Sequence, residues 1–149
     1  VEALTGIEPR HTHFGRSLLP VLAGDTDDHR DAVFCEGGRL HGETQCMERE
    51  STEGFEHPEG FLYWPRLGLQ YEEGPEHTKA IMCRTHDHKY VRRLYEPDEL
   101  YDLRNDPQEL HNRIDDPEMV DVLARLKDRL LSHYLETSDV VPPDADRRG

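Results

Sequence analysis

Residues 78–103 read TKAIMCRTHDHKYVRRLYEPDELYDL and form the most strongly patterned part of the chain. The turn sequences THDH and YEPD separate three short runs that contain apolar residues, at 78–84, 89–94 and 99–103. Turns of this composition join neighbouring strands that pair antiparallel. The run Ala80–Cys83 is apolar at both odd and even positions, which is typical of a strand covered on both faces. The stretch therefore predicts an antiparallel meander.

Residues 117–135 carry the most regular helical periodicity. Asp116 is a suitable N-cap for a helix that starts here, and Pro117 suits its first turn. Charged residues occupy mostly one side of the expected helix, and the other side is apolar. We therefore expect an amphipathic helix that covers one face of the sheet. Its apolar side consists of Met119, Val122, Leu123, Leu126, Leu130, Leu131 and Tyr134.

Segments upstream complete the expected fold. Residues 30–36 are strand-like and end at Gly37 and Gly38. Residues 1–6 have the pattern of a helix that ends at a C-cap glycine, Gly6. We expect an α+β fold in which a small antiparallel sheet of three to four strands is packed by one long C-terminal helix.

Changes in composition divide the chain into a connector region (1–28), a sheet-and-helix unit (29–136) and a polar, extended tail (137–149). Within the unit, residues 39–77 lack periodicity and far exceed the roughly 4–6 residues of an ordinary connection. The aromatic burst FLYWP at 61–65 argues against disorder. We interpret this segment as a long, irregular, ordered loop with a function.

Composition excludes several classes of protein. The 149 residues carry 18 basic and 32 acidic side chains, a net charge of −14, which opposes nucleic-acid binding by a basic face. No apolar run approaches the roughly 20 residues of a membrane span. Three cysteines do not make a disulfide framework, and their odd number favours reduced thiols and a soluble, cytoplasmic protein.

One helix covers only one face of the expected sheet, and no other predicted element remains for the second face. The chain begins with Val1, so we expect a piece of a larger protein. For the same reason, the lack of a signal peptide excludes nothing.

The sequence contains no strong motif for a metal site or a catalytic nucleophile. The pairs His11–His13 and His86–His88 lack the spacing of strong zinc motifs, and the second pair flanks a turn, where polar residues meet solvent. No serine lies in a Gly-x-Ser-x-Gly elbow. Cys35 lies beside Glu36, which disfavours a reactive thiolate.

Several strings resemble type I sulfatases, the formylglycine-dependent branch of the alkaline-phosphatase-like superfamily. Within residues 79–112, KAIMCRT, HKYVRR and ELYDLRNDPQELHN are similar to the strings that precede the last helix of these enzymes. LTGIEP at 4–9 and GRSLLP at 15–20 are similar to the passage out of their catalytic domain. ETSDVVP at 136–142 is similar to the tails of some bacterial members.

This resemblance implies the C-terminal subdomain of a bacterial sulfatase, docked on its own missing α/β catalytic domain. The parent would hydrolyse sulfate monoesters with a formylglycine and a calcium ion. The motif Cys/Ser-x-Pro/Ala-x-Arg that yields formylglycine is absent from the chain, so we assign no catalytic residue and no metal ligand and expect the chain alone to be inactive. The region would contribute packing and a substrate-pocket wall, for which the candidates are Arg39, His41, Tyr63 and Trp64.

Other interpretations stay open. The chain could be a free-standing acidic module whose aromatic loop binds a protein or a sugar, or a histidine-rich metal-binding domain. The parent could instead be a related phosphonate or phosphate monoester hydrolase. The uncovered sheet face could also drive self-association through Ala80–Cys83. Neither the ester that the parent cleaves nor its secretion follows from the sequence.

Overall fold

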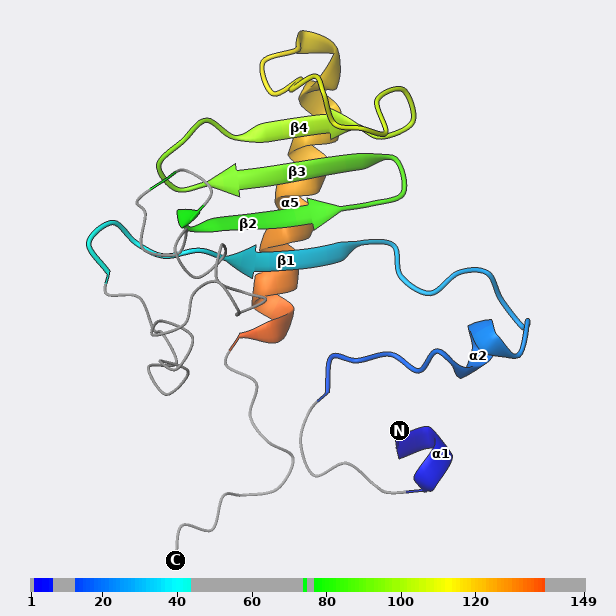
Figure 1. Cartoon of the computed structure of the whole chain (residues 1–149). Helices are drawn as coiled ribbons and strands as arrows, with labels where there is room; N and C mark the ends of the chain where they lie inside the picture. Colours follow the sequence, from blue (N-terminus) through cyan, green and yellow to red (C-terminus); the bar gives the residue numbers. More distant parts are fainter. Residues whose placement is uncertain (1, 7–12, 44–73, 75–76, 139–149) are drawn as a thin grey trace, which may run out of the picture.

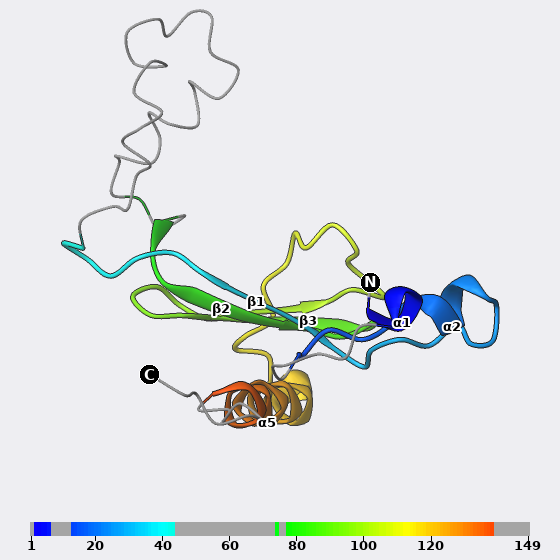
Figure 2. The same cartoon turned by 90° about the horizontal axis from the view of Figure 1, so that it is seen from below.

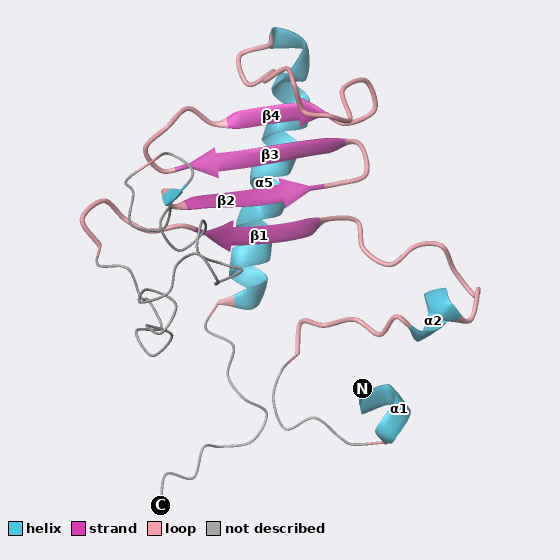
Figure 3. Cartoon of the chain, in the orientation of Figure 1, coloured by secondary structure: helices cyan, strands magenta, loops and turns pink. Residues whose placement is uncertain are grey.

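The computed structural model describes residues 2–6, 13–43, 74 and 77–138. An antiparallel sheet with one long helix across it forms the centre of this part of the chain (Figures 1 and 3). The elements are α1 (Glu2–Thr5), α2 (Leu19–Leu22), β1 (Val33–Gly37), β2 (Ala80–Arg84), β3 (His88–Arg93), β4 (Glu99–Asp102), the 3-10 turn η4 (Pro117–Met119) and α5 (Val120–Thr137).

The four strands lie in the order β1-β2-β3-β4, and every neighbouring pair is antiparallel. The predicted meander of β2, β3 and β4 is confirmed, as is the α+β fold class. The strand expected at 30–36 begins later, at Val33. Before it, the Asp31 carboxylate pairs with Arg129 of α5 at 2.9 Å, so this residue ties the entry of β1 to the helix.

One row of side chains crosses all four strands toward α5. The register places Phe34 opposite Cys83, Cys83 opposite Tyr90, and Tyr90 opposite Leu100. Cys83 and Leu100 are fully buried and Tyr90 nearly so. Helix residues close the core from the other side, and the buried members there are Met119, Leu126 and Leu130.

The long helix begins as predicted. The Asp116 carboxylate accepts a hydrogen bond from the backbone N–H of Glu118 at 2.9 Å, which satisfies one of the donors left free at a helix start. The first turn is a 3-10 turn, and regular α-helix then runs to Thr137, two residues beyond the predicted end.

The second face of the sheet is only partly covered. Edge-on, the sheet has α5 under one face, and the loop after β4 rises over the other (Figure 2). In this loop Glu109 forms an ion pair with Lys89 of β3. Toward β1, the alternate positions Cys35 and Met82 lie opposite each other and are exposed and half-buried, respectively. On this face Val91 of β3, which lies opposite Met82, is buried, so the described residues cover the face only in part. The expectation that Ala80–Cys83 is covered on both faces depends on a neighbouring domain and stays a prediction.

The N-terminal segment runs beside the sheet without packing into its core (Figure 1). Within the predicted connector region 1–28, Leu19–Leu22 form the single helical turn α2. The predicted end of α1 is confirmed, since Gly6 has a φ of 68° that suits a C-cap glycine. Large apolar side chains of this segment are exposed, and they are Leu4, Phe14, Leu18 and Leu22.

Candidate functional site

Gly38 lets two distant parts of the chain cross at the end of β1. Its φ of 80° lies in the left-handed region that glycine adopts without strain. A Cβ atom at this position would overlap the carbonyl oxygen of Thr78 and lie 2.8 Å from the nitrogen of Lys79. The backbone of Thr78 therefore passes directly over Gly38, which leaves no room for a side chain.

Backbone hydrogen bonds lock this crossing. The Arg39 N–H donates to the carbonyl of His77 at 2.9 Å, and the Lys79 N–H donates to the carbonyl of Arg39 at 3.0 Å. Together they form a short parallel bridge between Arg39 and Thr78. The two ends of the long loop predicted at 39–77 are thereby held side by side.

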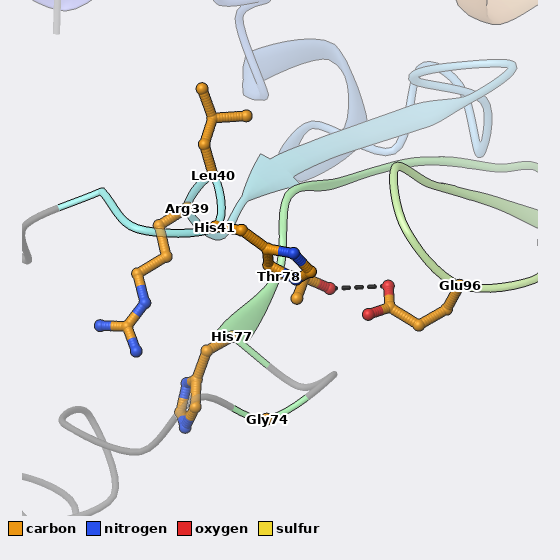
Figure 4. Close-up of a pocket in the computed structure, with 7 residues that line it drawn as sticks. All are labelled: Arg39, Leu40, His41, Gly74, His77, Thr78 and Glu96. Atoms are coloured by element: carbon orange, nitrogen blue, oxygen red, sulfur yellow. Dashed lines mark hydrogen bonds between the residues drawn. The ribbon is translucent and has the colours of Figure 1, made fainter.

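A pocket of about 270 Å³ lies at this junction (Figure 4). The Thr78 hydroxyl donates to the Glu96 carboxylate at 2.7 Å. In Figure 4 the Glu96 carboxylate points toward Thr78 and His41, whereas the Leu40 side chain points the opposite way from His77. The pocket is lined by Arg39, Leu40, His41, Gly74, His77, Thr78 and Glu96.

The ring of His41 is held in place by Tyr95. The two rings stack with centroids 3.7 Å apart and planes 14° from parallel. The backbone N–H of His41 also donates to the Tyr95 hydroxyl at 3.3 Å. Because Tyr95 and Glu96 are neighbours in the turn between β3 and β4, the position of this turn sets the shape of the pocket.

Asp98 anchors that turn to β3. Its carboxylate accepts hydrogen bonds from the Tyr90 hydroxyl at 2.7 Å, the Arg92 guanidinium at 2.9 Å and the Arg93 N–H at 3.1 Å. Burial disfavours the charged carboxylate, but these donors outweigh burial and hold the pKa of Asp98 below its usual value. Burial and the bond to Asp98 together raise the pKa of Tyr90.

Replacing Asp98 by asparagine should lower the free energy of unfolding by about 2 kcal/mol at pH 7, since hydrogen bonds to a charged group are each worth roughly 1.5–3 kcal/mol. A carboxyl group whose pKa is depressed in the folded state stabilises the protein above the unfolded pKa of about 3.9, and this contribution disappears as pH falls through the folded pKa. Urea unfolding at pH 7 and near pH 2 measures both values.

We expect the difference between Asp98→Asn and the unchanged chain to shrink toward zero at the lower pH. The exposed Asp128, for which the structure gives no ion pair among the described residues, provides the control, and Asp128→Asn should unfold like the unchanged chain at both pH values. An equal loss for Asp98→Asn at both pH values would show that packing, not charge, holds the turn.

The structure brings together two of the four predicted wall residues. Arg39 and His41 line the pocket, whereas Tyr63 and Trp64 lie outside the described residues. Sequence reasoning missed His77, Thr78 and Glu96, which lie 38 or more residues downstream of Arg39. The one signal in the sequence was the Gly37–Gly38 pair. Two glycines indicate that something approaches the backbone closely, but they do not identify the approaching segment.

The histidine pairs do not form a metal site in the described part of the chain, where no group of three or more His, Cys, Asp or Glu side chains could hold an ion. His86 is exposed at the β2–β3 turn. His88 is half-buried and lines a second pocket, of about 470 Å³, between this turn and α5. His11 of the other pair lies outside the described residues.

Comparison with protein families gives a match over part of the chain. Residues 66–136 match the family model of the C-terminal domain of N-sulphoglucosamine sulphohydrolase. The matched segment covers 71 of the 149 residues, slightly less than half of the chain. A stretch of 55 residues is 51% identical to the uncharacterized sulfatase YidJ of Escherichia coli (strain K12), covering 37% of this chain and 11% of YidJ.

Solved structures extend the similarity of fold beyond this matched segment to nearly the whole chain. A sulfatase candidate from Bacteroides thetaiotaomicron VPI-5482 superposes with a TM-score of 0.62 at 24% identity, covering 99% of this chain and 26% of that chain. The 2-O GAG sulfatase BT1596 superposes with a TM-score of 0.62 at 24% identity, and the match covers 93% of this chain and 23% of that chain. The phosphonate monoester hydrolase of Agrobacterium radiobacter superposes with a TM-score of 0.60 at 25% identity, and the match covers 91% of this chain and 23% of that chain.

The chain spans about a quarter of the length of these solved structures and about a tenth of YidJ. The fold of the sheet, the helix and the segment before them is thus a recurring part of larger proteins. Among the described helices, none combines the length and the apolar character needed to cross a membrane.

Proposed function

We propose that this chain is the C-terminal part of a sulfuric ester hydrolase, to which it contributes packing and a wall of the substrate pocket. The match of residues 66–136 to a sulfatase C-terminal domain carries this proposal. The similarity to about a quarter of each solved structure supports a division of labour, in which the remainder of the parent protein supplies the catalytic centre.

The parent is proposed to use a formylglycine and a calcium ion, as sulfatases generally do. The residues of this chain do not fit either group. No cysteine or serine stands in a Cys/Ser-x-Pro/Ala-x-Arg sequence, and the described residues offer no cluster of three metal-ligating side chains. Cleavage of a sulfate ester needs a positioned nucleophile and a cation that neutralises developing charge. We therefore expect the 149-residue chain alone to be inactive.

Docking on the catalytic domain is the proposed role of two exposed apolar surfaces. The open end of the sheet carries Val33, Cys35 and Met82, of which Val33 is 48% exposed. The N-terminal segment exposes apolar side chains such as Leu4 and Leu22, at 74% and 78%. Exposed apolar side chains that gather on one surface are typical of interfaces, and we propose that the rest of the parent protein covers these.

Replacing Met82 by glutamate should separate docking from folding. In the 149-residue chain the half-buried side chain faces solvent, so we expect Tm to change by less than 2 °C. In the full-length protein the new charge would be buried without a partner, and we expect Tm to fall by several degrees. Differential scanning calorimetry on both proteins measures the two shifts.

A matched control is Ala124→Glu, which introduces the same charge on the exposed surface of α5 and should leave both proteins unchanged. Equal shifts for Met82→Glu in the two proteins would contradict docking through this face. Concentration-dependent dimers of the 149-residue chain that Met82→Glu abolishes would instead support self-association through the same face.

Activity of the full-length protein tests the proposed function itself. We expect hydrolysis of an aryl sulfate by the full-length protein and none by the 149-residue chain. The phosphonate monoester hydrolase among the similar structures makes phosphonate and phosphate monoester hydrolysis the second candidate. Turnover of an aryl phosphonate monoester that exceeds turnover of the aryl sulfate would favour this candidate. Inactivity toward both esters would favour a free-standing binding module.

A further inference from the structure

A third pocket, of about 440 Å³, lies between α5 and the face of the sheet that this helix crosses, the lower face in Figure 2. Its floor is apolar, because Leu130 belongs to the core and Ile81 packs against the core. Leu131 also lines the pocket and is 59% exposed, so apolar surface is open to solvent here. The volume falls within the roughly 300–1,000 Å³ of small-molecule pockets. The lining consists of Ile81, Tyr90, Arg92, Asp98, Lys127, Leu130, Leu131 and Tyr134.

Two basic side chains lie near Tyr90 at one end of this pocket. The Lys127 ammonium lies over the Tyr90 ring, 5.6 Å from its centroid. The Arg92 guanidinium lies beside Asp98, to which it donates at 2.9 Å. Asp98 is the one acid among the described lining residues, and it already accepts hydrogen bonds from Tyr90, Arg92 and Arg93. Within the described part of the chain no carboxylate pairs with Lys127, so positive charge is left over at this end.

The opposite end of the pocket lies near a negative charge. Tyr134 is seven residues beyond Lys127, which is two helical turns or roughly 10 Å along α5. The Tyr134 hydroxyl donates to the Glu36 carboxylate of β1 at 3.1 Å. The register places Glu36 opposite Ile81, and Ile81 opposite Arg92. The apolar floor therefore has basic groups on one side and an acid on the other.

This arrangement selects a ligand that combines an apolar chain with one anionic group. An inorganic anion leaves the apolar floor unused, and the net charge of −14 of the chain opposes it. A ligand that is only apolar leaves the Lys127 ammonium without a charged partner. A cationic head group is repelled by Lys127 and Arg92, which line the pocket, whereas Glu36 does not. The two-turn length of the pocket favours an elongated chain over a compact group.

We infer that this pocket binds an aliphatic monocarboxylate. The carboxylate group lies beside Arg92 and Lys127, and the chain extends along α5 toward Tyr134. The reverse orientation is disfavoured, because it brings the carboxylate of the ligand close to that of Glu36. The inference goes beyond the proposed function, since binding here requires neither a catalytic domain nor the hydrolysis of an ester.

The test is a titration of the isotope-labelled 149-residue chain followed by NMR, with octanoate, acetate and octylammonium as separate probes. We expect saturable shifts of the Leu130 and Leu131 methyl signals with octanoate, at a millimolar dissociation constant. Acetate lacks the apolar chain and octylammonium has the opposite charge, so each should bind about tenfold more weakly or worse. Nuclear Overhauser contacts between the terminal methyl group of octanoate and the Tyr134 ring check the orientation.

Three outcomes of this titration would overturn the inference. Octylammonium that binds as tightly as octanoate would show an apolar surface without selection for charge. Shifts that rise linearly with octanoate concentration, without saturation, would show the absence of a site. A terminal methyl group that contacts Lys127 in place of Tyr134 would contradict the proposed orientation.

Two matched pairs of variants on α5 separate binding from folding, because all four side chains are exposed and each variant should keep the amide spectrum of the unchanged chain. Lys127→Gln should weaken octanoate binding about fivefold, near the upper limit for an exposed ion pair, whereas Arg125→Gln, outside this lining, should not. Leu131→Asn should weaken binding about fivefold through lost apolar contact, whereas Leu135→Asn, also outside the lining, should not. Undiminished octanoate binding by Lys127→Gln and Leu131→Asn would overturn the inference.

Discussion

Replacing Gly38 by alanine is expected to lower the free energy of unfolding by about 3 kcal/mol. Two costs add at this position. A φ of 80° places an L residue in the left-handed region, at a cost of roughly 1–2 kcal/mol. The new Cβ would also lie 2.5 Å from the carbonyl carbon of Thr78, and relieving such overpacking typically costs about 1–3 kcal/mol. Urea unfolding followed by circular dichroism measures the loss.

Two other glycines separate these costs. Gly24 has a φ of 77° but nothing within 4 Å of its Cβ position, so Gly24→Ala should lose only the conformational cost, about 1 kcal/mol. Gly37 lies in β1 without a positive φ and also faces open space, so Gly37→Ala should be close to neutral. Equal losses for Gly38→Ala and Gly24→Ala would show that Thr78 can move aside.

The consequence of Gly38→Ala extends to the pocket. If the strands separate at this crossing, the bridge between Arg39 and Thr78 opens, and Thr78 moves relative to Glu96. We therefore expect amide-exchange protection of Arg39 and Lys79 to fall further than that of Tyr90, whose position in the core is distant from the crossing.

Replacing Leu100 by alanine should lower the free energy of unfolding by about 3 kcal/mol, within the roughly 2–5 kcal/mol range of buried leucines. Leu100 is fully buried, and it ends the apolar row that begins at Phe34 and continues through Cys83 and Tyr90. The Leu100 N–H donates to the side-chain oxygen of Asn112 at 2.9 Å, which holds this part of β4 in place. The cavity would therefore persist instead of collapsing.

Leu110 provides the matched control. It is 70% exposed in the loop that follows β4, so Leu110→Ala should change stability by less than about 0.5 kcal/mol in the 149-residue chain. A loss for Leu100→Ala as small as that for Leu110→Ala would contradict the assignment of this row as the core. Chemical unfolding of the two variants under identical conditions gives the comparison.

The local pattern of apolar, capping and turn residues was sufficient to predict much of the fold. The spacing of apolar residues over 117–135 predicted α5, because a helix buries one side chain in every three or four. Asp116 and Pro117 predicted its start, since capping is decided by a few consecutive residues. The meander of β2, β3 and β4 followed from turn residues placed between short apolar runs.

The pairing of β1 with β2 did not follow from pattern, because 42 residues separate Gly37 from Ala80, and contacts at such separation depend on chain closure instead of local preference. For this reason the sequence did not decide whether the sheet has three or four strands. The same separation concealed the pocket. Arg39 and His41 were identified as wall candidates, but their neighbours His77 and Glu96 became visible only once the two chain segments crossed.

The sequence by itself determined the type and order of the elements between β2 and α5 and the resemblance to sulfatases, because these reside in residues close together along the chain. Only the tertiary structure decided that Gly38 must lack a side chain, that Thr78 and Tyr95 orient Glu96 and His41, and that Met82 faces the open side of the sheet. Each of these depends on the distance between segments that the chain brings together only by folding.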